Sequence, residues 1–455
     1  MLDVRIDQQA LEDLEAHLQG QLIFPSDDNY DKARRVWNGM IDRYPALIAR
    51  CANAADVASV VRFAQSQHLP ASVRGGGHNV AGTSVCDGGI LIDLSLMKAI
   101  QVDPTTQTVW AGAGLLLGEF VRETQMFGLG TTVGTISPTG LSGLTLGGGI
   151  GWLMGKYGLT VDSLLAVDIV TADGQVLRAS ATEHPDLFWG VRGGGGNFGV
   201  VTSFKFQLHP VGTLLAGMVV HPMARAREVL RFYREYTSKA PDELTCLALF
   251  ATMPDGLAAV IIALCYCGPL DEGERVIAPV RTFGPPVVDL IQPMSYLDLT
   301  TMIDMTLPNG RSYYDKSSTL KGELSDEAID TLIASASSFT SPFSQVLIPH
   351  VHGAACRIAP TATAVAALRD EAYVIEIIAA WEKSEARQHI EWARAFWEAM
   401  EPFATRGVYI NFLNDEKEER IRASYGINYD RLVALKNTYD PTNFFHFNQN
   451  IKPTV

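Results

Sequence analysis

Three glycine-rich runs limit what this chain can fold into more than any other feature of its sequence. They read RGGGHN at 74–79, LGGGIG at 146–151 and RGGGGNFG at 192–199. Backbone without side chains turns tightly and lets several amide N–H groups meet on one anion. One such run usually marks a tight turn, but several beside predicted strands favour loops that surround a long diphosphate-bearing ligand. His78, which directly follows the first glycines, needs an explanation of its own.

Common nucleotide-binding motifs do not account for these runs. Residues 194–199 match the GxGxxG dinucleotide fingerprint, which requires a helix immediately afterwards because the pyrophosphate binds at the helix N-terminus. Residues 200–208 alternate between apolar and polar side chains and therefore predict a strand instead. A P-loop is excluded as well, because 151–156 is one residue too short and Tyr157 stands where serine or threonine is required.

The length and charge of the chain exclude several classes of protein. Its 455 residues exceed one ordinary hydrophobic core and predict two domains. A net charge of −14 argues against nucleic acid as a partner. The N-terminal segment lacks the basic and apolar regions of a signal peptide, and no apolar run is long enough for a membrane span. We therefore expect a cytoplasmic protein with six reduced cysteines and no membrane association.

The order of the predicted elements indicates an α+β fold. Strands are expected at 71–75, 89–95, 107–114 and 199–210, helices after Asn53 and at 115–127, and a hairpin over 166–180. Glycine becomes rarer after residue 210, and residues 211–415 mix strands with helices. This mixture predicts an antiparallel sheet with helices on one face.

Long, ordered segments carry a more specific signal. They read FPSDDNYDKARRVWNGMIDRYPALIARC at 24–51, SVRGGGHNVAG at 72–82, GGILIDLSLMKAI at 88–100, TLGGGIGWLMGKYGLTVDSLLAVDIVTADG at 145–174, FWGVRGGGGNFGVVTSFKF at 188–206 and YGINYDRLVALKNTYDPTNFFHFNQNI at 425–451. Together they resemble the berberine bridge enzyme-like FAD-linked oxidases of the vanillyl-alcohol oxidase/p-cresol methylhydroxylase flavoprotein superfamily. The resemblance implies a two-lobed FAD-binding domain, residues 1–210 and 418–455. It also implies a substrate-binding domain, residues 211–417, with an antiparallel sheet covered by helices.

The resemblance explains the histidine beside the first glycine run. In such proteins the glycines hold the FAD pyrophosphate and the histidine bonds covalently to the flavin 8α-methyl carbon, which implies this role for His78. Some relatives have a second bond from a cysteine, but Ser137-Pro138 stands where they have Cys-Pro, so a single covalent bond is expected. The residues implied to bind FAD are Arg74, Gly75, Gly76, Gly77, His78, Asn79, Ser137, Gly140, Ser142, Gly148, Gly149, Ile150, Gly151, Val201, Asn448 and Gln449.

For activity, the resemblance implies an FAD-dependent oxidase that transfers hydride from a small organic substrate to the flavin and then reduces O2 to H2O2. Alcohols, sugars, amines and secondary metabolites are the substrate classes left open. A flavin-dependent oxidative cyclase or oxygenase of natural-product biosynthesis, or a cofactor-bound carrier without turnover, are the alternatives. The expected partners are the small-molecule substrate and O2, and the expected state is a monomer or homodimer.

An oxidase also needs a group that accepts the substrate proton. In the resembling family the C-terminal segment lies beside the flavin, which favours Tyr429 as the base and leaves Tyr409 and Tyr425 as further candidates. A tyrosine needs a lowered pKa to act near neutral pH, so a nearby cation or hydrogen-bond donor is expected. His350 and His352 share a strand face, but no third ligand lies near them in the sequence, so no metal site is predicted.

Overall fold

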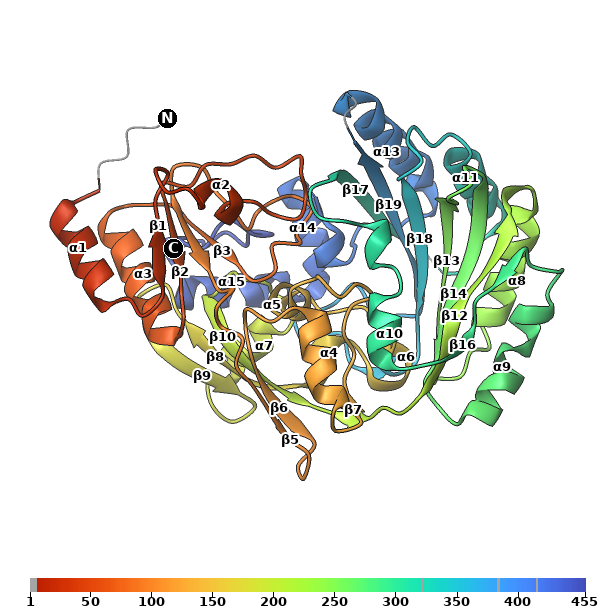
Figure 1. The fold of residues 1–455 in the computed structure, drawn as a ribbon, viewed down its shortest axis with the longest axis horizontal. Coiled ribbons are helices and arrows are strands. Elements are labelled where there is room, and N and C mark those ends of the chain that lie inside the picture. The colour runs from red at the N-terminus through yellow and green to blue at the C-terminus, as the bar shows by residue number, and fades with distance from the viewer. Residues whose placement is uncertain (1–5, 321, 383–384, 415) are drawn as a thin grey trace.

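The chain forms three main sheets. A loop or a face of each sheet borders the cavity described in the next subsection. The computed structural model describes residues 6–320, 322–382, 385–414 and 416–455. It has the α+β architecture expected from the sequence, with two smaller sheets from the first half of the chain and a larger sheet from the middle (Figure 1).

The first sheet leads the chain into the first glycine run. Its strands are β1 (Gln21–Ile23), β2 (Leu47–Arg50), β3 (Ala71–Arg74) and β4 (Ile90–Asp93), in the order β1-β2-β4-β3. β2 and β3 both pair with β4 in parallel, and helix α3 (Ala54–Ser66) makes the crossover between β2 and β3. Asn53 caps this helix by accepting a hydrogen bond from the Asp56 N–H, which fixes its start where the sequence predicted it.

The second sheet contains the strand that comes directly after the third glycine run. Its strands, in spatial order, are β5 (Ile100–Asp103), β6 (Thr108–Gly112), β10 (Val200–Gln207), β8 (Leu164–Val170) and β9 (Val176–Ser180). All pairs are antiparallel, and β8 with β9 forms the predicted hairpin. The third glycine run lies between α7 (Pro185–Val191) and β10. A strand therefore succeeds the GxGxxG pattern, as its alternating sequence predicted.

The third sheet has eight antiparallel strands and provides the opposite wall of the site. Its strands are β15 (Val288–Asp289), β12 (Leu214–Pro222), β14 (Ala258–Tyr266), β13 (Leu244–Thr252), β18 (Gln345–Val351), β19 (Ala372–Trp381) and β17 (Ser312–Thr319), with β16 (Gln292–Met294) paired to β12. Helices along one side of this sheet in Figure 1 are α8 (Ala226–Thr237), α9 (Leu270–Thr282), α11 (Asp326–Ala336) and α13 (Ala386–Met400). Apolar side chains of these helices and of the sheet form one buried cluster, which leaves the other face of the sheet for the site.

The C-terminal segment returns to the N-terminal sheets, and the C-terminus lies beside them in Figure 1. It contains α14 (Glu418–Tyr425) and α15 (Tyr429–Tyr439), the latter in contact with α7. The remaining elements are α1 (Gln8–His17), α2 (Tyr30–Ala33), α4 (Leu117–Gln125), α5 (Leu141–Leu146), α6 (Met154–Tyr157), α10 (Tyr296–Thr301), α12 (Ala354–Arg357) and the paired short strands β7 (Leu129–Gly130) and β11 (His209–Pro210). None of the helices in the described ranges is long and apolar enough to cross a bilayer. All six cysteines are unpaired.

Candidate active site

A cavity of about 350 Å³ lies between the glycine runs and the eight-stranded sheet. On one side its wall consists of the loop after β3, the residues around α5 and the start of β10. On the other side it consists of residues from β13, β18, β19 and β17. The C-terminal segment completes the wall with Phe445, Phe447, Asn448 and Gln449. Segments that are far apart in the sequence therefore share one site.

The first glycine run has no room for side chains. A Cβ atom on Gly76 would lie 2.4 Å from the backbone nitrogen of Gly140, and one on Gly75 would lie 2.1 Å from Oγ of Ser142. Both distances are far below van der Waals contact. Gly77 has a φ of 67°, a conformation that favours glycine whatever the available space. The backbone of this run therefore forms the cavity wall directly.

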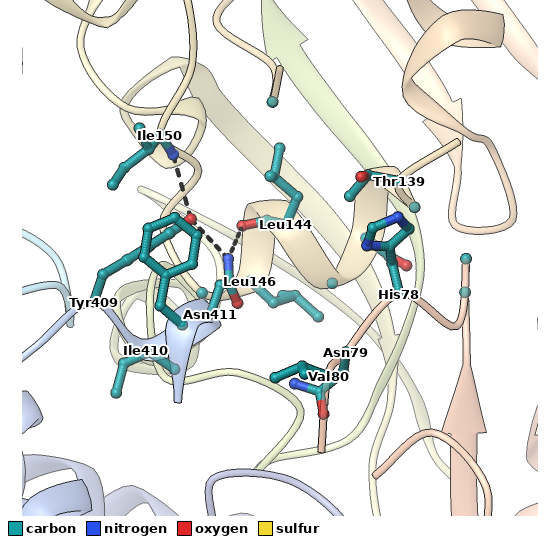
Figure 2. A pocket seen from close by; sticks show the side chains of 18 of the residues that line it. His78, Asn79, Val80, Thr139, Leu144, Leu146, Ile150, Tyr409, Ile410 and Asn411 are labelled. Carbon is teal, nitrogen blue, oxygen red and sulfur yellow. Dashed lines mark hydrogen bonds between the residues drawn. The ribbon is translucent and has the colours of Figure 1, made fainter. Parts of the chain in front are cut away.

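Stacking holds the ring of His78, which follows these glycines on the cavity wall (Figure 2). Its centroid lies 4.2 Å from that of Trp37, and Trp37 in turn stacks on Tyr313 at 3.8 Å. The Trp37 indole N–H donates to the Leu307 carbonyl at 3.0 Å, which fixes the middle ring. Burial lowers the pKa of His78 to about 4, so the imidazole is neutral near pH 7. Its Nε2 is buried and has no hydrogen-bond partner within the described ranges.

Two carboxyl groups line the cavity from the eight-stranded sheet, and the sequence analysis did not single them out. Asp315 on β17 lies opposite Ile378 of β19, and Glu376 lies two residues before Ile378. Because alternate residues of a strand share a face, the two carboxyl side chains are diagonal neighbours on the cavity side. Oδ1 of Asp315 is buried and no described residue forms a hydrogen bond with it.

Both carboxyl groups hold protons more tightly than they would in water. Burial raises the pKa of Asp315 to about 8. Burial raises the pKa of Glu376 as well, and the neighbouring Asp315 charge raises it further. Asp315 is buried, whereas part of the Glu376 surface is open to the cavity while the surrounding protein still shields it from bulk water. The pair therefore retains a proton near neutral pH, and Glu376 is the member more accessible to a bound molecule.

A signal for Glu376 was present in the sequence. It is the one charged residue in AYVIEIIAAW, the apolar segment 372–381. Burying a carboxyl group without a partner costs free energy, so such a residue marks either a buried ion pair or a functional site. Asp315 was harder to find because Lys316 follows it. Adjacent residues of a strand point to opposite faces, so the sequence alone does not tell which of the two side chains reaches the cavity. Lys316 lies on the other face and pairs with Glu416 at 2.7 Å.

Tyr409 lies on the cavity wall and anchors the second glycine run. Its hydroxyl oxygen accepts hydrogen bonds from Asn411 Nδ2 at 2.7 Å and from the Ile150 N–H at 3.3 Å (Figure 2). It also accepts one from the Gly149 N–H at 2.8 Å. Burial raises the pKa of this tyrosine to about 12. A neutral hydroxyl that already accepts these bonds is suited to anchoring the loop and unsuited to accepting a proton near pH 7. Gly148 and Gly149 lie behind it, outside the set of residues that line the cavity.

Tyr425 and Tyr429 face the core of the N-terminal sheets and not the cavity. Both belong to the large buried apolar cluster, and neither is among the described residues that line the cavity. The turn between α14 and α15 directs Tyr425 toward the Gly194 carbonyl, at 3.5 Å, and places the Tyr429 ring 4.8 Å from the Arg422 guanidinium. Burial raises the pKa of both tyrosines. Neither hydroxyl is therefore placed to meet a molecule in the cavity.

Most of the residues implied to bind FAD lie on the cavity wall. They are Gly75, Gly76, Gly77, His78, Asn79, Gly140, Ser142, Ile150, Gly151, Val201, Asn448 and Gln449. Arg74 and Ser137 lie outside this set, and each binds an acidic side chain. The Arg74 guanidinium binds the Asp93 carboxylate at 2.8 Å, and the Ser137 hydroxyl donates to Asp304 at 2.6 Å. Both residues support the loops without facing the cavity.

Lys436 joins the C-terminal segment to the third glycine run. Its side chain is fully buried, and its ammonium group donates to the carbonyls of Asn197 at 2.9 Å and Phe445 at 2.8 Å and to the Asp440 carboxylate at 2.7 Å. One cation thus fixes two loops that meet at the cavity. This arrangement explains how a segment more than two hundred residues away in the chain becomes part of the wall.

Two family profiles match the chain. One is described as FAD binding domain and matches residues 45–180, and the other is described as berberine and berberine like and matches residues 408–452. An FAD-linked oxidoreductase from Dictyostelium discoideum is 33% identical over 431 residues, which cover 94% of this chain and 93% of that protein. (R)-6-hydroxynicotine oxidase from Paenarthrobacter nicotinovorans is 37% identical over 288 residues, or 63% of each chain.

Solved structures share the fold over almost the whole chain. The crystal structure of 6-hydroxy-D-nicotine oxidase from Arthrobacter nicotinovorans superposes with a TM-score of 0.89 at 31% identity, covering 96% of this chain and 98% of that one. Berberine bridge enzyme superposes with a TM-score of 0.87 at 21% identity, covering 98% of both chains. The second likeness concerns the fold alone. These superpositions include both the glycine side and the sheet side of the cavity.

Proposed function

Because the chain belongs to the berberine bridge enzyme-like family of FAD-linked oxidoreductases, we propose that it is an oxidase that holds FAD covalently through His78. Its substrate is a small organic molecule, and O2 is the final electron acceptor, which yields H2O2. The observation that carries this proposal is the state of His78. Its imidazole is neutral, has an unpartnered buried nitrogen among the described residues and stacks on Trp37 at the end of a glycine run.

The residues on the glycine side of the cavity fit FAD. Bound FAD supplies the hydride acceptor of the reaction. The side-chain-free backbone from Gly75 to Gly77 suits a pyrophosphate, because its N–H groups can approach the anion closely. A neutral imidazole has the nitrogen lone pair that a covalent bond to the flavin requires. A single bond is supported by Ser137, whose hydroxyl is engaged with Asp304.

We propose Glu376 as the group that accepts the substrate proton. The other titratable side chains on the cavity wall are His78, Tyr409, Asp315 and the thiol of Cys246. His78 is assigned to the cofactor, while Tyr409 and Cys246 have pKa values raised by burial. Asp315 is buried, whereas part of Glu376 is open to the cavity, so Glu376 is the member of the pair that a substrate can reach. A carboxylate with a raised pKa is a stronger base than an ordinary one and thus suits proton abstraction near neutral pH.

The two sides of the cavity also suggest which part of the chain binds the cofactor and which binds the substrate. We propose that residues 1–210 and 418–455 bind FAD and that residues 211–417 bind the substrate. His78, Gly140 and Asn448 come from the first set, and Asp315 and Glu376 from the second. Substrate and cofactor would then meet in the cavity between them.

A direct test tracks the flavin after denaturation. Acid-precipitated wild-type protein should stay yellow, and a tryptic peptide that contains His78 should carry the mass of FAD. The variant His78→Ala should release all of its flavin on precipitation. Wild-type flavin that washes out of the precipitate would refute the covalent bond. Activity is then checked by H2O2 release and product mass, since oxidation removes two hydrogens whereas an oxygenase adds oxygen and a cyclase forms a ring.

A further inference from the structure

The cavity wall holds two carboxyl groups and no strongly basic side chain. Among its described residues these are Asp315 and Glu376, and neither lysine nor arginine is present. Nearby basic side chains are turned away and paired elsewhere. Lys316 lies on the opposite face of β17 and pairs with Glu416 at 2.7 Å, and Arg420 also binds the Ser317 carbonyl and lies beside Glu416. The described part of the wall therefore offers the carboxyl pair no cation to neutralise it.

Other buried carboxylates of this protein are fully partnered. Asp162 receives both guanidinium nitrogens of Arg369, at 2.7 and 2.9 Å, and Asp440 receives the Lys436 ammonium at 2.7 Å. Asp315, by contrast, has a buried oxygen without a hydrogen bond to any described residue. Such a group costs free energy in the folded state unless something binds it. A cationic ligand with N–H donors would remove that cost.

Resting on the proposed function, we infer that the substrate is an amine, which enters as a cation and binds with its nitrogen at the Asp315–Glu376 pair. The surrounding wall supports an apolar body for this molecule, since Leu247, Leu347 and Ile378 line the cavity beside the pair. A carboxylate-bearing substrate would gain no such contact, because its negative charge would oppose ionisation of the pair. A sugar would leave many hydroxyl groups against apolar side chains.

Oxidation of an amine needs one proton acceptor and one hydride acceptor, and the proposed function supplies both in Glu376 and FAD. The ammonium N–H gives its proton to the carboxylate of Glu376, which leaves a neutral amine with a free lone pair. The C–H bond beside nitrogen then breaks, and its electron pair leaves with the hydrogen as hydride to FAD. The nitrogen lone pair forms the C=N bond of an iminium ion. The substrate has thus lost one hydride and one proton, and water can later hydrolyse the iminium to a carbonyl compound and an amine.

Amine binding should also displace a proton from the pair. The titratable groups near the pair are Tyr313, two residues before Asp315 on β17, and Tyr409 near Glu376, and burial raises the pKa of both tyrosines far above neutrality. They stay neutral and do not contribute to the displaced proton. The release therefore reports on Asp315 and Glu376 alone.

The test uses holoenzyme and paired ligands of equal shape that have no hydrogen on the carbon beside the heteroatom. One pair is 2-phenylpropan-2-amine and 2-phenylpropan-2-ol, and the other is 2-methylpropan-2-amine and 2-methylpropan-2-ol. Titration calorimetry near pH 7 in buffers with different ionisation enthalpies measures both affinity and proton release. In at least one pair, the amine should bind about tenfold or more tightly than its alcohol, as a charge-assisted contact predicts, and should release protons. Amines that bind no better than their alcohols in both pairs would overturn the inference.

Variants of the two carboxyl residues test whether the amine preference arises at this pair. Asp315→Asn and Glu376→Gln should each lose most of the amine preference and of the proton release, while alcohol binding stays unchanged and shows that the cavity is intact. Glu391→Gln, an exposed carboxylate on α13 that pairs with Arg387, should behave as wild type. A preference that survives both cavity variants would also overturn the inference.

Failure of this inference and failure of the proposed function give different results. If alcohols or sugars reduce the flavin anaerobically while amines neither bind nor reduce it, the oxidase assignment stands and the amine assignment fails. If the protein carries no flavin, the oxidase assignment fails, whatever the binding preference of the cavity.

Discussion

The two sides of the cavity are built from different parts of the polypeptide. On the glycine side the wall is backbone, and Gly76 and Gly140 approach so closely that neither can carry a side chain. On the sheet side the wall consists of side chains, with Asp315 and Glu376 among apolar neighbours. A backbone wall cannot be altered at one position without moving a loop. A strand can exchange one side chain for another while its hydrogen-bonded ladder remains.

The difference separates two tasks of the site. Under the proposed function, the backbone side would provide a fixed surface for the cofactor. The sheet side would determine which molecule is bound and which group takes its proton. We therefore expect changes on the glycine side to abolish cofactor binding and destabilise the fold, whereas isosteric changes on the sheet side should leave cofactor binding intact.

The largest expected effect comes from Gly76→Ala. The new Cβ would lie 2.4 Å from the Gly140 nitrogen, so a loop must move. We expect flavin content, measured as visible absorbance per protein, to fall below about a tenth of wild type, with a loss of about 1–3 kcal/mol or more in stability. Gly212→Ala is the matched control, since no atom lies within 4 Å of its added Cβ. Normal flavin loading in Gly76→Ala would show that the backbone wall is more adaptable than the geometry indicates.

Glu376→Gln tests the sheet side. Flavin content should stay close to wild type, because glutamine has nearly the same shape. Anaerobic reduction of the flavin by substrate should slow by about 10²–10⁴-fold, the usual contribution of a general base. In wild type the rate should rise with pH, because burial raises the pKa of Glu376 and only its ionised form accepts a proton. Stopped-flow reduction within threefold of wild type would remove Glu376 from this role.

Asp315→Asn tests the cost of the unpartnered carboxyl group. The pKa of Asp315 in the folded protein is about 8, above its ordinary value of 3.8. Between these values the folded state holds a proton that the unfolded state has released, so the free energy of unfolding falls as pH rises through this window. The asparagine variant lacks this dependence and should gain stability relative to wild type between pH 5 and 8, by on the order of a few kcal/mol. Denaturant titrations at several pH values measure the difference, and parallel curves would contradict it.

The sequence pointed to the backbone side of the cavity and not to the carboxyl pair on the side-chain side, for a physical reason. A glycine run can be read locally, because the absence of Cβ atoms already restricts what the loop can do. Asp315 and Glu376 are 61 residues apart, as their numbers show, and meet only through the register of β17 on β19. Tyr429 was chosen because the C-terminal segment was expected at the flavin. The segment does reach the cavity at Asn448, but the turn before α15 sends Tyr429 into the core.

The smallest expected effect is that of Tyr429→Phe, and its contrast with Tyr409→Phe sharpens the comparison. Phenylalanine keeps the ring that packs in the core and faces Arg422. Stability should therefore change by less than about 0.5 kcal/mol, and flavin reduction should stay within about threefold of wild type, far from the loss expected of a general base. Tyr409→Phe should lose on the order of 1–3 kcal/mol, because the N–H groups of Gly149 and Ile150 lose their buried acceptor. Both variants are compared by thermal melting and by anaerobic stopped-flow reduction. A slow reductive half-reaction in Tyr429→Phe with unchanged stability would restore this tyrosine as the base and place the chemistry on the backbone side of the cavity.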